Sequence, residues 1–172
     1  HQTFVHNRLT RTNFTARLIL AVRAAFERLK EPLSPEQAAD QTRRLRQVAD
    51  ELIEALLWVD EAPLGAKLSG TSGFEQRFAA AGPRDRQGRS LRDFDLTRRV
   101  FRYPCSYVIY SAAFDALPSE LRDIIWQRLG AILRDPEPPL KYDHLSVADR
   151  TAIREILLDT KPQLPESWRR QP

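Results

Sequence analysis

The stretch FRYPCSYVIYSAAFDALP, residues 101–118, decides whether this chain contains a β-sheet. Within it, CSYVIY (105–110) is the one run that alternates over more than four positions, as a half-buried strand does. No second alternating run offers a partner, and a strand without a partner leaves its backbone groups unpaired. We therefore expect a helix from Pro104 through Phe114, with Pro104 at its first position, where a missing N–H is harmless.

A long first helix is predicted upstream from apolar residues that recur at spacings of three and four. Arg11 is placed off this apolar face, and Pro32 ends the helix. The residues of the face are Phe14, Leu18, Val22, Ala25 and Leu29, with Val5 and Leu9 extending it towards the N-terminus.

Four capping boxes, in which Ser is followed three residues later by an acidic residue or Gln, predict further helices. They are Ser34 with Gln37, Ser72 with Glu75, Ser90 with Asp93, and Ser146 with Asp149. The helices are expected from Pro35 to Val59, from Ser72 to Ala80, from Ser90 to Arg102 and from Ser146 onwards, and LPSE (117–120) opens one more.

These patterns predict an all-α fold, an irregular bundle of about six or seven helices. A chain of 172 residues is expected to form one compact domain, which we place at residues 1–161. Residues 162–172 are expected to be a tail pinned by Trp168. No apolar run approaches the roughly 20 residues that span a bilayer, so we expect no transmembrane segment in this chain.

The net charge of +4 is concentrated in residues 84–103, which hold seven Arg and three Asp, while the remainder sums to zero. A nucleic-acid-binding surface usually needs a broader basic face and a recognisable motif. The interleaved Asp residues instead predict internal ion pairs, for example between Asp95 and Arg98. We expect no nucleic-acid partner, and an Arg-dependent binder of phosphate remains the weaker reading.

Cys105, the single cysteine, has two interpretations. In the first turn of a helix its thiolate would be stabilised, and His144 could act as the base of a thiol enzyme. Free cysteines are also among the most buried residues of proteins. We favour a buried Cys105 packed among aromatic side chains and keep the thiol enzyme as the alternative.

His1 and His6 are the candidate metal or cofactor ligands. A spacing of five residues rotates the second side chain by about 140° on a helix, which is poor geometry for gripping one ion together. Each imidazole could instead serve a separate haem, zinc or copper site completed by other residues. The alternative is that both are polar helix positions that meet solvent.

Four short runs in the middle of the chain resemble, in the same order, a segment of a poorly characterised group of large exported bacterial proteins. The runs are GRSLR (88–92), FDL (94–96), YPCSY (103–107) and FDALP (114–118). HQTFVHNRLTR (1–11) and AIREILLDTKPQLPESW (152–168) also resemble the group, so the resemblance covers nearly the whole chain. It implies the C-terminal part of a longer protein, which agrees with a chain that starts at His1 and lacks methionine.

Some members of this group occur alongside c-type cytochromes. The resemblance therefore implies a periplasmic or otherwise exported protein, with haem or a transition metal held by His1, His6 and residues upstream of them. We expect a helical accessory or binding domain of an electron-transfer system, whose partners are other protein subunits, including cytochromes. The thiol enzyme using Cys105 with His144 and a purely structural interaction domain remain the alternatives, so enzymatic activity is left open.

Overall fold

The computed structural model describes residues 2–169 and confirms the all-α fold. Its described part holds seven α-helices and two short 3₁₀-helices, and its one β-interaction is an isolated bridge between Phe94 and Phe101. No helix in this part is both long and apolar enough to cross a bilayer. The elements are α1 (Gln2–Leu29), α2 (Pro35–Leu56), α3 (Phe74–Ala80), η1 (Tyr107–Tyr110), α4 (Ala112–Asp115), α5 (Ser119–Arg134), η2 (Leu140–Tyr142), α6 (Val147–Thr160) and α7 (Glu166–Arg169).

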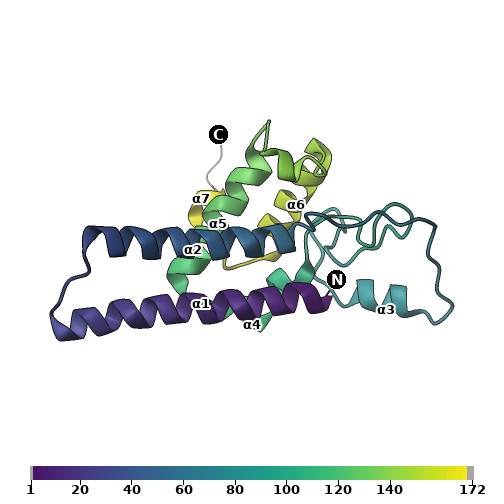
Figure 1. The fold of residues 1–172 in the computed structure, drawn as a ribbon. Coiled ribbons are helices and arrows are strands. Elements are labelled where there is room, and N and C mark those ends of the chain that lie inside the picture. The colour runs from purple at the N-terminus through teal and green to yellow at the C-terminus, as the bar shows by residue number, and fades with distance from the viewer. Residues whose placement is uncertain (1, 170–172) are drawn as a thin grey trace.

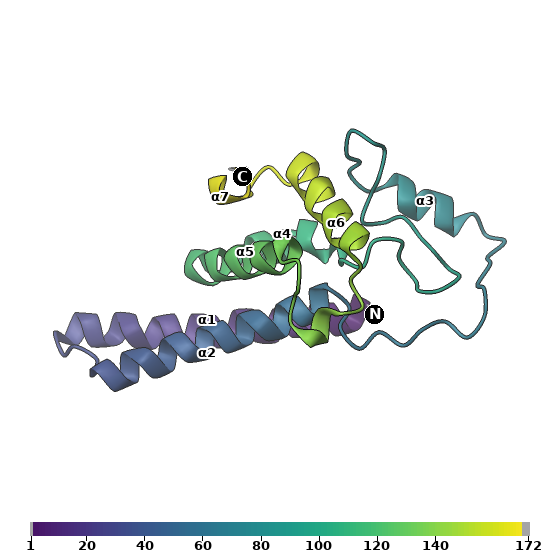
Figure 2. The same cartoon turned by 90° about the horizontal axis from the view of Figure 1, so that it is seen from above.

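The helices build outwards from the antiparallel pair α1 and α2, which lie side by side over most of their length (Figure 1). Helix α5 lies against α2, and α6 packs against α5. Seen from above, the far end of the α1–α2 hairpin extends past α5 (Figure 2), as it also does in Figure 1. The last turns of α1 therefore lie beside α2 and beyond α5, whereas Arg23 still reaches Glu120 at the start of α5.

Two of the four predicted capping boxes form as expected. At the start of α2, the amide of Gln37 donates to the Ser34 hydroxyl at 3.2 Å, and the Ser34 amide donates to the Gln37 side chain at 2.9 Å. Ser146 and Asp149 make the same reciprocal pair at the start of α6. These boxes satisfy amides that the first helical turn leaves unpaired, so the local sequence alone fixes both helix starts.

The helix predicted from Ser90 to Arg102 is wrong. The Ser90 amide donates to the Asp93 carboxylate at 2.9 Å, but the chain then turns back on itself instead of continuing as a helix. The Asp95 carboxylate accepts the amides of Thr97 and Arg98, both at 3.0 Å, and closes this turn. Ser and Asp side chains that bond nearby amides compete with helix formation, and here that competition prevails.

The box predicted at Ser72 and Glu75 does not form either. Helix α3 begins one residue later, after Gly73, whose φ of 66° lies in the left-handed region that glycine adopts without strain. Gly73 has no side chain to cap this helix, and the Ser72 hydroxyl accepts the amide of Phe74, at 3.4 Å, and not that of Glu75. The Glu75 carboxylate instead accepts the amide of Gly70 at 3.1 Å, so it stabilises the preceding loop.

The continuous helix predicted from Pro104 through Phe114 is also wrong, although the segment does avoid a strand. Only η1 and α4 form there, separated at Ser111, whose hydroxyl caps α4 by accepting the Phe114 amide at 3.2 Å. Upstream, the Ser106 amide donates to the carbonyl oxygen of Leu56 at 2.7 Å, at the C-terminal end of α2. This tertiary bond holds the backbone in an extended conformation that a helix would not allow.

The segment after Pro162 packs onto the domain through Trp168, which is 1% exposed. Its indole N–H donates to the carbonyl oxygen of Trp126 at 2.9 Å, and the two rings pack edge to face at 5.6 Å. Gly130 permits this approach, because a Cβ there would lie 3.0 Å from the indole nitrogen of Trp168. Trp168 is thus the anchor that the sequence suggested.

Candidate functional site

Helix α1 has two apolar faces, whereas the sequence predicted one. Val5 and Leu9 are buried against the rest of the domain, but Phe14 is 70% exposed and Leu18 56% exposed. Phe14 lies nine residues after Val5, which is two and a half helical turns and places the two side chains on opposite faces. The prediction that Val5 and Leu9 extend the face of Phe14 is therefore wrong.

The buried face of α1 includes two small side chains. Thr12 and Ala16 are buried there, and the Thr12 hydroxyl lies 3.4 Å from the carbonyl oxygen of Val48 on α2. Together with Val5, Leu9 and Ile19 they form the face of α1 that the rest of the domain covers. The apolar residues on the opposite side of α1 remain exposed.

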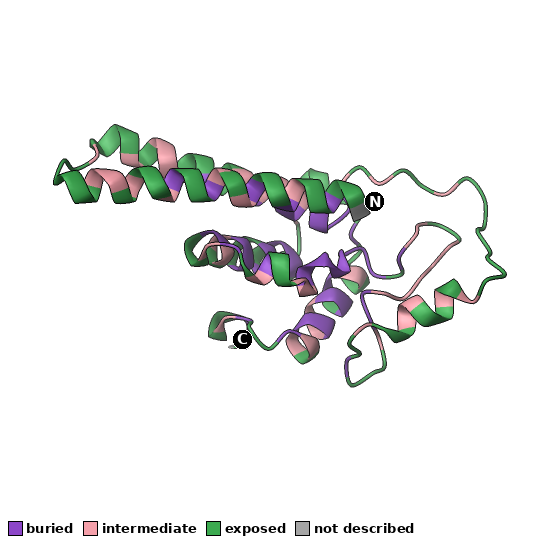
Figure 3. Ribbon diagram, turned by 90° about the horizontal axis from the view of Figure 1, so that it is seen from below, coloured by how far each residue is buried: buried purple, intermediate pink, exposed green. Residues whose placement is uncertain are grey.

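We call the exposed apolar face of α1 the outer stripe. It contains five of the nine large hydrophobic residues that are exposed in the described part of the chain, and the other four are scattered over other segments. Figure 3 shows exposed residues recurring along the whole length of the hairpin. Single exposed apolar residues are ordinary, but aligned ones mark interaction surfaces. The outer stripe consists of Phe4, Phe14, Leu18, Val22 and Leu29.

A shallow hollow of about 470 Å³ lies where the outer stripe meets α2. Leu18, Ile19 and Val22 form its α1 side, and the α2 residues that line it include Asp40 and Arg44. Asp40 is already paired with both Arg43 and Arg44, at 2.5 and 2.7 Å. The hollow thus has an apolar wall and a wall of charged residues that largely neutralise one another.

Helix α1 carries an excess of positive charge, with five arginines against one glutamate. Arg8 and Arg23 are neutralised by Glu51 and Glu120, each at 2.7 Å. Among residues 2–169, no carboxylate forms an ion pair with the three remaining arginines, which are exposed. These three unneutralised arginines are Arg11, Arg17 and Arg28.

Arg11 lies on the outer stripe itself, contrary to the sequence interpretation, because it precedes Leu18 by seven residues or about two turns. Arg17 and Arg28 flank the stripe on the side away from α2. The Arg17 guanidinium donates only to neutral groups, namely the Asn13 side chain and the carbonyl oxygen of Ala116, each at 3.0 Å. The outer stripe is therefore an apolar surface with a positive border.

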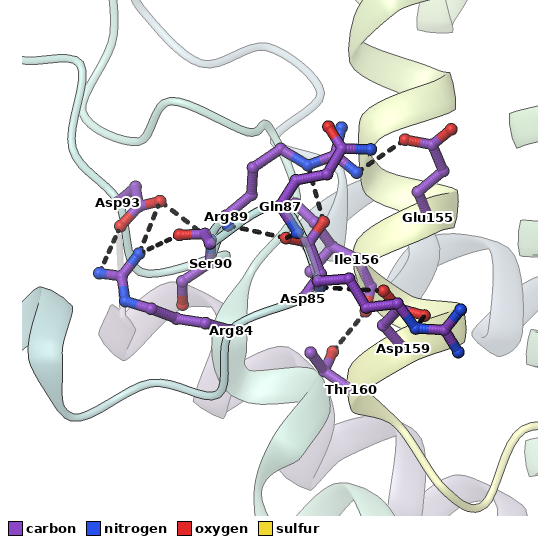
Figure 4. A network of polar contacts seen from close by, with 12 residues as sticks. Arg84, Asp85, Gln87, Arg89, Ser90, Asp93, Glu155, Ile156, Asp159 and Thr160 are labelled. Atoms are coloured by element: carbon purple, nitrogen blue, oxygen red, sulfur yellow. Dashed lines mark hydrogen bonds and ion pairs between the residues drawn. The ribbon is translucent and has the colours of Figure 1, made fainter.

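Each of the three aspartates of the arginine-rich segment 84–103 pairs with an arginine of the same segment, as predicted. Arg89 bridges Asp85 and Glu155 of α6, each at 2.7 Å, and Arg84 pairs with Asp93 at 3.0 Å (Figure 4). The predicted pair of Arg98 with Asp95 also forms, at 3.1 Å.

Burial alone would raise the pKa of Asp85, but the backbone amide and guanidinium of Arg89 hold that pKa below its usual value. The carboxylate therefore stays charged and keeps Arg89 in place. The charges that dominate the sequence thus serve mainly to attach this loop to α6.

Cys105 is fully buried, which confirms the prediction that it packs in the core. Burial raises the pKa of its thiol to about 12, so the nucleophilic thiolate is strongly disfavoured near neutral pH. His144 is exposed, and its Nε2 lies 2.8 Å from the carbonyl oxygen of Leu57. The structure gives no support to a pairing of these two residues as nucleophile and base.

His144 lines a pocket of about 430 Å³ together with Trp58, Glu61 and Arg99, whereas Cys105 is not among the lining residues. Burial raises the pKa of Glu61, although Arg99 and His144 act in the opposite direction. Trp58 adopts a φ of 56°, which is unusual for a bulky residue. The pocket resembles a ligand site in its titratable groups, but Arg99 is already engaged by Asp149 at 2.6 Å.

The candidate ligands His1 and His6 stand at the start of the chain. His6 is exposed near the start of α1, and His1 lies outside the described residues. Within residues 2–169, no group of three or more His, Cys, Asp or Glu residues is arranged to hold a metal ion. The assignment of both histidines as haem or metal ligands stays a prediction.

Comparisons with protein-family models, curated proteins and solved structures found no match to this chain. The outer stripe therefore has to be interpreted from its own geometry. The sequence pattern identified four of its five residues, missed Phe4, and did not predict their exposure. The available signal was the second apolar set, Val5, Leu9, Ala16 and Ile19, which occupies the opposite side of the same helical wheel.

Proposed function

We propose that this chain is a helical binding domain that docks a partner protein through the outer stripe of α1. The observation that carries the proposal is the alignment of five large apolar side chains on one exposed helix face. The α1–α2 hairpin holds that face on a rigid element, and α5 and α6 lie elsewhere on the domain. This is the arrangement expected of a surface that receives another helix.

The energetic argument favours a partner over permanent exposure. Each Å² of apolar surface removed from water contributes roughly 25 cal/mol, so covering several side chains of this size contributes a few kcal/mol. The residues of the outer stripe add little to the stability of the isolated domain, because they are exposed in it. Their apolar character is best explained by an association that buries them.

Photo-crosslinking tests this proposal in the native host. A photoreactive amino acid at Leu18 is expected to give one discrete crosslinked protein, and the product should be lost when Val22→Ser is added. The matched control is Val147, an apolar residue that is 68% exposed on α6 and lies outside the outer stripe. The proposal fails if position 18 gives no discrete product, or if positions 18 and 147 give the same one.

We further propose, on the resemblance alone, that the partner belongs to an exported electron-transfer system and that His1 and His6 lie near its haem or metal. The ultraviolet–visible spectrum and metal content of the native protein test this setting. A Soret band or stoichiometric metal, reduced in a His6→Ala variant, is the expected result. A colourless and metal-free native protein would remove the redox setting and leave the docking function in place.

A further inference from the structure

We infer that the partner segment is an acidic amphipathic α-helix, which lies along α1 with its apolar face on the outer stripe and its carboxylates on Arg11, Arg17 and Arg28. This inference rests on the proposed function and specifies the chemistry of the partner. It is carried by the coincidence of an unpartnered apolar face and three unneutralised arginines on one helix.

The positive border argues against a second copy of the chain as the occupant. If two α1 helices packed stripe to stripe, each would bring Arg11, Arg17 and Arg28 to the contact, and Glu27 is the one acidic residue of α1. Glu27 lies nine residues after Leu18, which places it on the opposite face of the helix. Like charges facing each other across an interface are unfavourable, so self-association through this face is opposed.

The spacing of the arginines sets the expected pattern on the partner. Arg17 and Arg28 are eleven residues apart, so they project from nearly the same side of α1 and are separated by about 16 Å along its axis. A partner helix meets both if it carries two carboxylates at the same spacing. Arginine suits this role, because its guanidinium fork matches a carboxylate with two parallel hydrogen bonds.

The shape of the hollow favours a helix over a lipid surface. Glu36 and Asp40 of α2 stand beside Leu18 and Val22. The hollow also lies between two helices, which suits a third helix better than a flat bilayer. The neighbouring Arg43 and Arg44 already hold Asp40, so the hollow itself adds little net charge.

A designed peptide provides a direct probe. The peptide is a helix with leucines on one face and two glutamates eleven residues apart at the edge of that face. One control peptide has the same composition with both glutamates on the opposite face, and a second has lysine in place of glutamate. Binding of each peptide to the intact chain is measured by fluorescence anisotropy at low and at physiological salt. Binding of the chain to vesicles of phosphatidylcholine containing phosphatidylserine is measured in parallel.

The inference predicts that the first peptide binds most tightly and that salt weakens it, because the arginines and glutamates are exposed. Leu18→Ser is expected to weaken binding by about tenfold or more, whereas Leu140→Ser, at a residue that is 87% exposed elsewhere, should leave it unchanged. Arg17→Gln and Arg28→Gln should each weaken binding by about twofold to fivefold. Arg86→Gln, at a side chain that is 90% exposed in the 84–103 segment, is the matched control.

Several outcomes overturn the inference and leave the docking function standing. The inference fails if the lysine peptide, or the peptide with displaced glutamates, binds the chain as tightly as the first peptide does. It also fails if the chain binds the vesicles and none of the peptides. A basic or uncharged partner helix recovered by crosslinking at position 18 has the same meaning. Absence of binding by all probes overturns the inference as well, while absence of a crosslink overturns the proposed function.

Discussion

The guanidinium of Arg99 contacts the carboxylate of Asp149 at 2.6 Å and ties the irregular loop before Phe101 to the first turn of α6. The same guanidinium donates to the carbonyl oxygen of Arg102 at 2.7 Å. Asp149 also belongs to the capping box of α6, where it accepts from the Ser146 hydroxyl at 2.8 Å. One carboxylate therefore serves a helix start and a long-range connection.

Arg99→Gln is expected to lower the free energy of unfolding by roughly 1.5–3 kcal/mol, because it removes charge-assisted hydrogen bonds at a largely buried pair. Urea denaturation measures this change. Arg98→Gln is the matched control, since its side chain is 79% exposed while paired with Asp95, and we expect a loss below about 1 kcal/mol. Equal losses in the two variants would show that burial does not distinguish these pairs.

Acid should weaken the domain partly through Asp149. Burial alone would raise the pKa of this carboxyl, but Arg99 and Ser146 together hold it below its usual value. Its stabilising contribution is therefore complete above the unfolded pKa, about 3.9, and is lost as pH falls towards the lower folded value. The free energy of unfolding of Asp149→Asn should fall less steeply below about pH 4 than that of the unsubstituted chain, and parallel curves would contradict this assignment.

Cys105 is expected to resist iodoacetamide in the folded protein and to react once the protein is unfolded in guanidinium. The reason is its complete burial, which raises the pKa of the thiol to about 12. Mass spectrometry of labelled protein across pH 7–9 measures the reaction. Rapid labelling of the folded chain, abolished by His144→Ala, would revive the thiol enzyme.

Trp168→Ala should lower the free energy of unfolding by about 3–5 kcal/mol, the usual cost of removing a large buried aromatic side chain. Gly130→Ala should also destabilise the domain, by roughly 1–3 kcal/mol, because the added methyl would meet the Trp168 ring at 3.0 Å. Thermal denaturation compares both with Ser167→Ala, an exposed neighbour. If Trp168→Ala is neutral, the C-terminal segment does not contribute to the core.

The two faces of α1 should respond differently to the same substitution. Leu9→Ala is expected to cost about 2–5 kcal/mol, since Leu9 is 2% exposed, whereas Leu18→Ala should change stability by less than about 0.5 kcal/mol. Urea denaturation of the two variants measures both free energies of unfolding and shows which face of α1 belongs to the core. A large loss for Leu18→Ala would mean that the outer stripe contributes to the core and is not available for docking.

The fold class and several helix starts could be predicted from local chemistry. Ser34 with Gln37 and Ser146 with Asp149 begin helices where the sequence placed them, because each box satisfies its own amides within one turn. The same motif at Ser90 and Asp93 gave a turn instead. There Asp95 bonds the amides of the next turn, and Phe94 stacks on Phe101 at 5.3 Å, which draws the chain back on itself.

The candidate site depended on information that local patterns do not contain. Helical periodicity identified four of the five residues of the outer stripe, but periodicity does not tell which of two apolar faces the rest of the domain will cover. In α1 the rest of the domain covers the face of Val5, Leu9 and Ala16, and this leaves Phe14 and Leu18 exposed.

The pairing of the arginines also depended on tertiary contacts that the sequence does not show. The arginines of residues 84–103 dominate the sequence, yet folding brings Glu155 and Asp149 of α6 to them. Arg11, Arg17 and Arg28 are less conspicuous in the sequence but meet no carboxylate in the described part of the fold. The sequence by itself determined an all-α chain with a buried cysteine, because helix periodicity, caps and apolar character act over a few residues. Only the tertiary structure decided which apolar face and which arginines stay available, because that depends on contacts between distant segments.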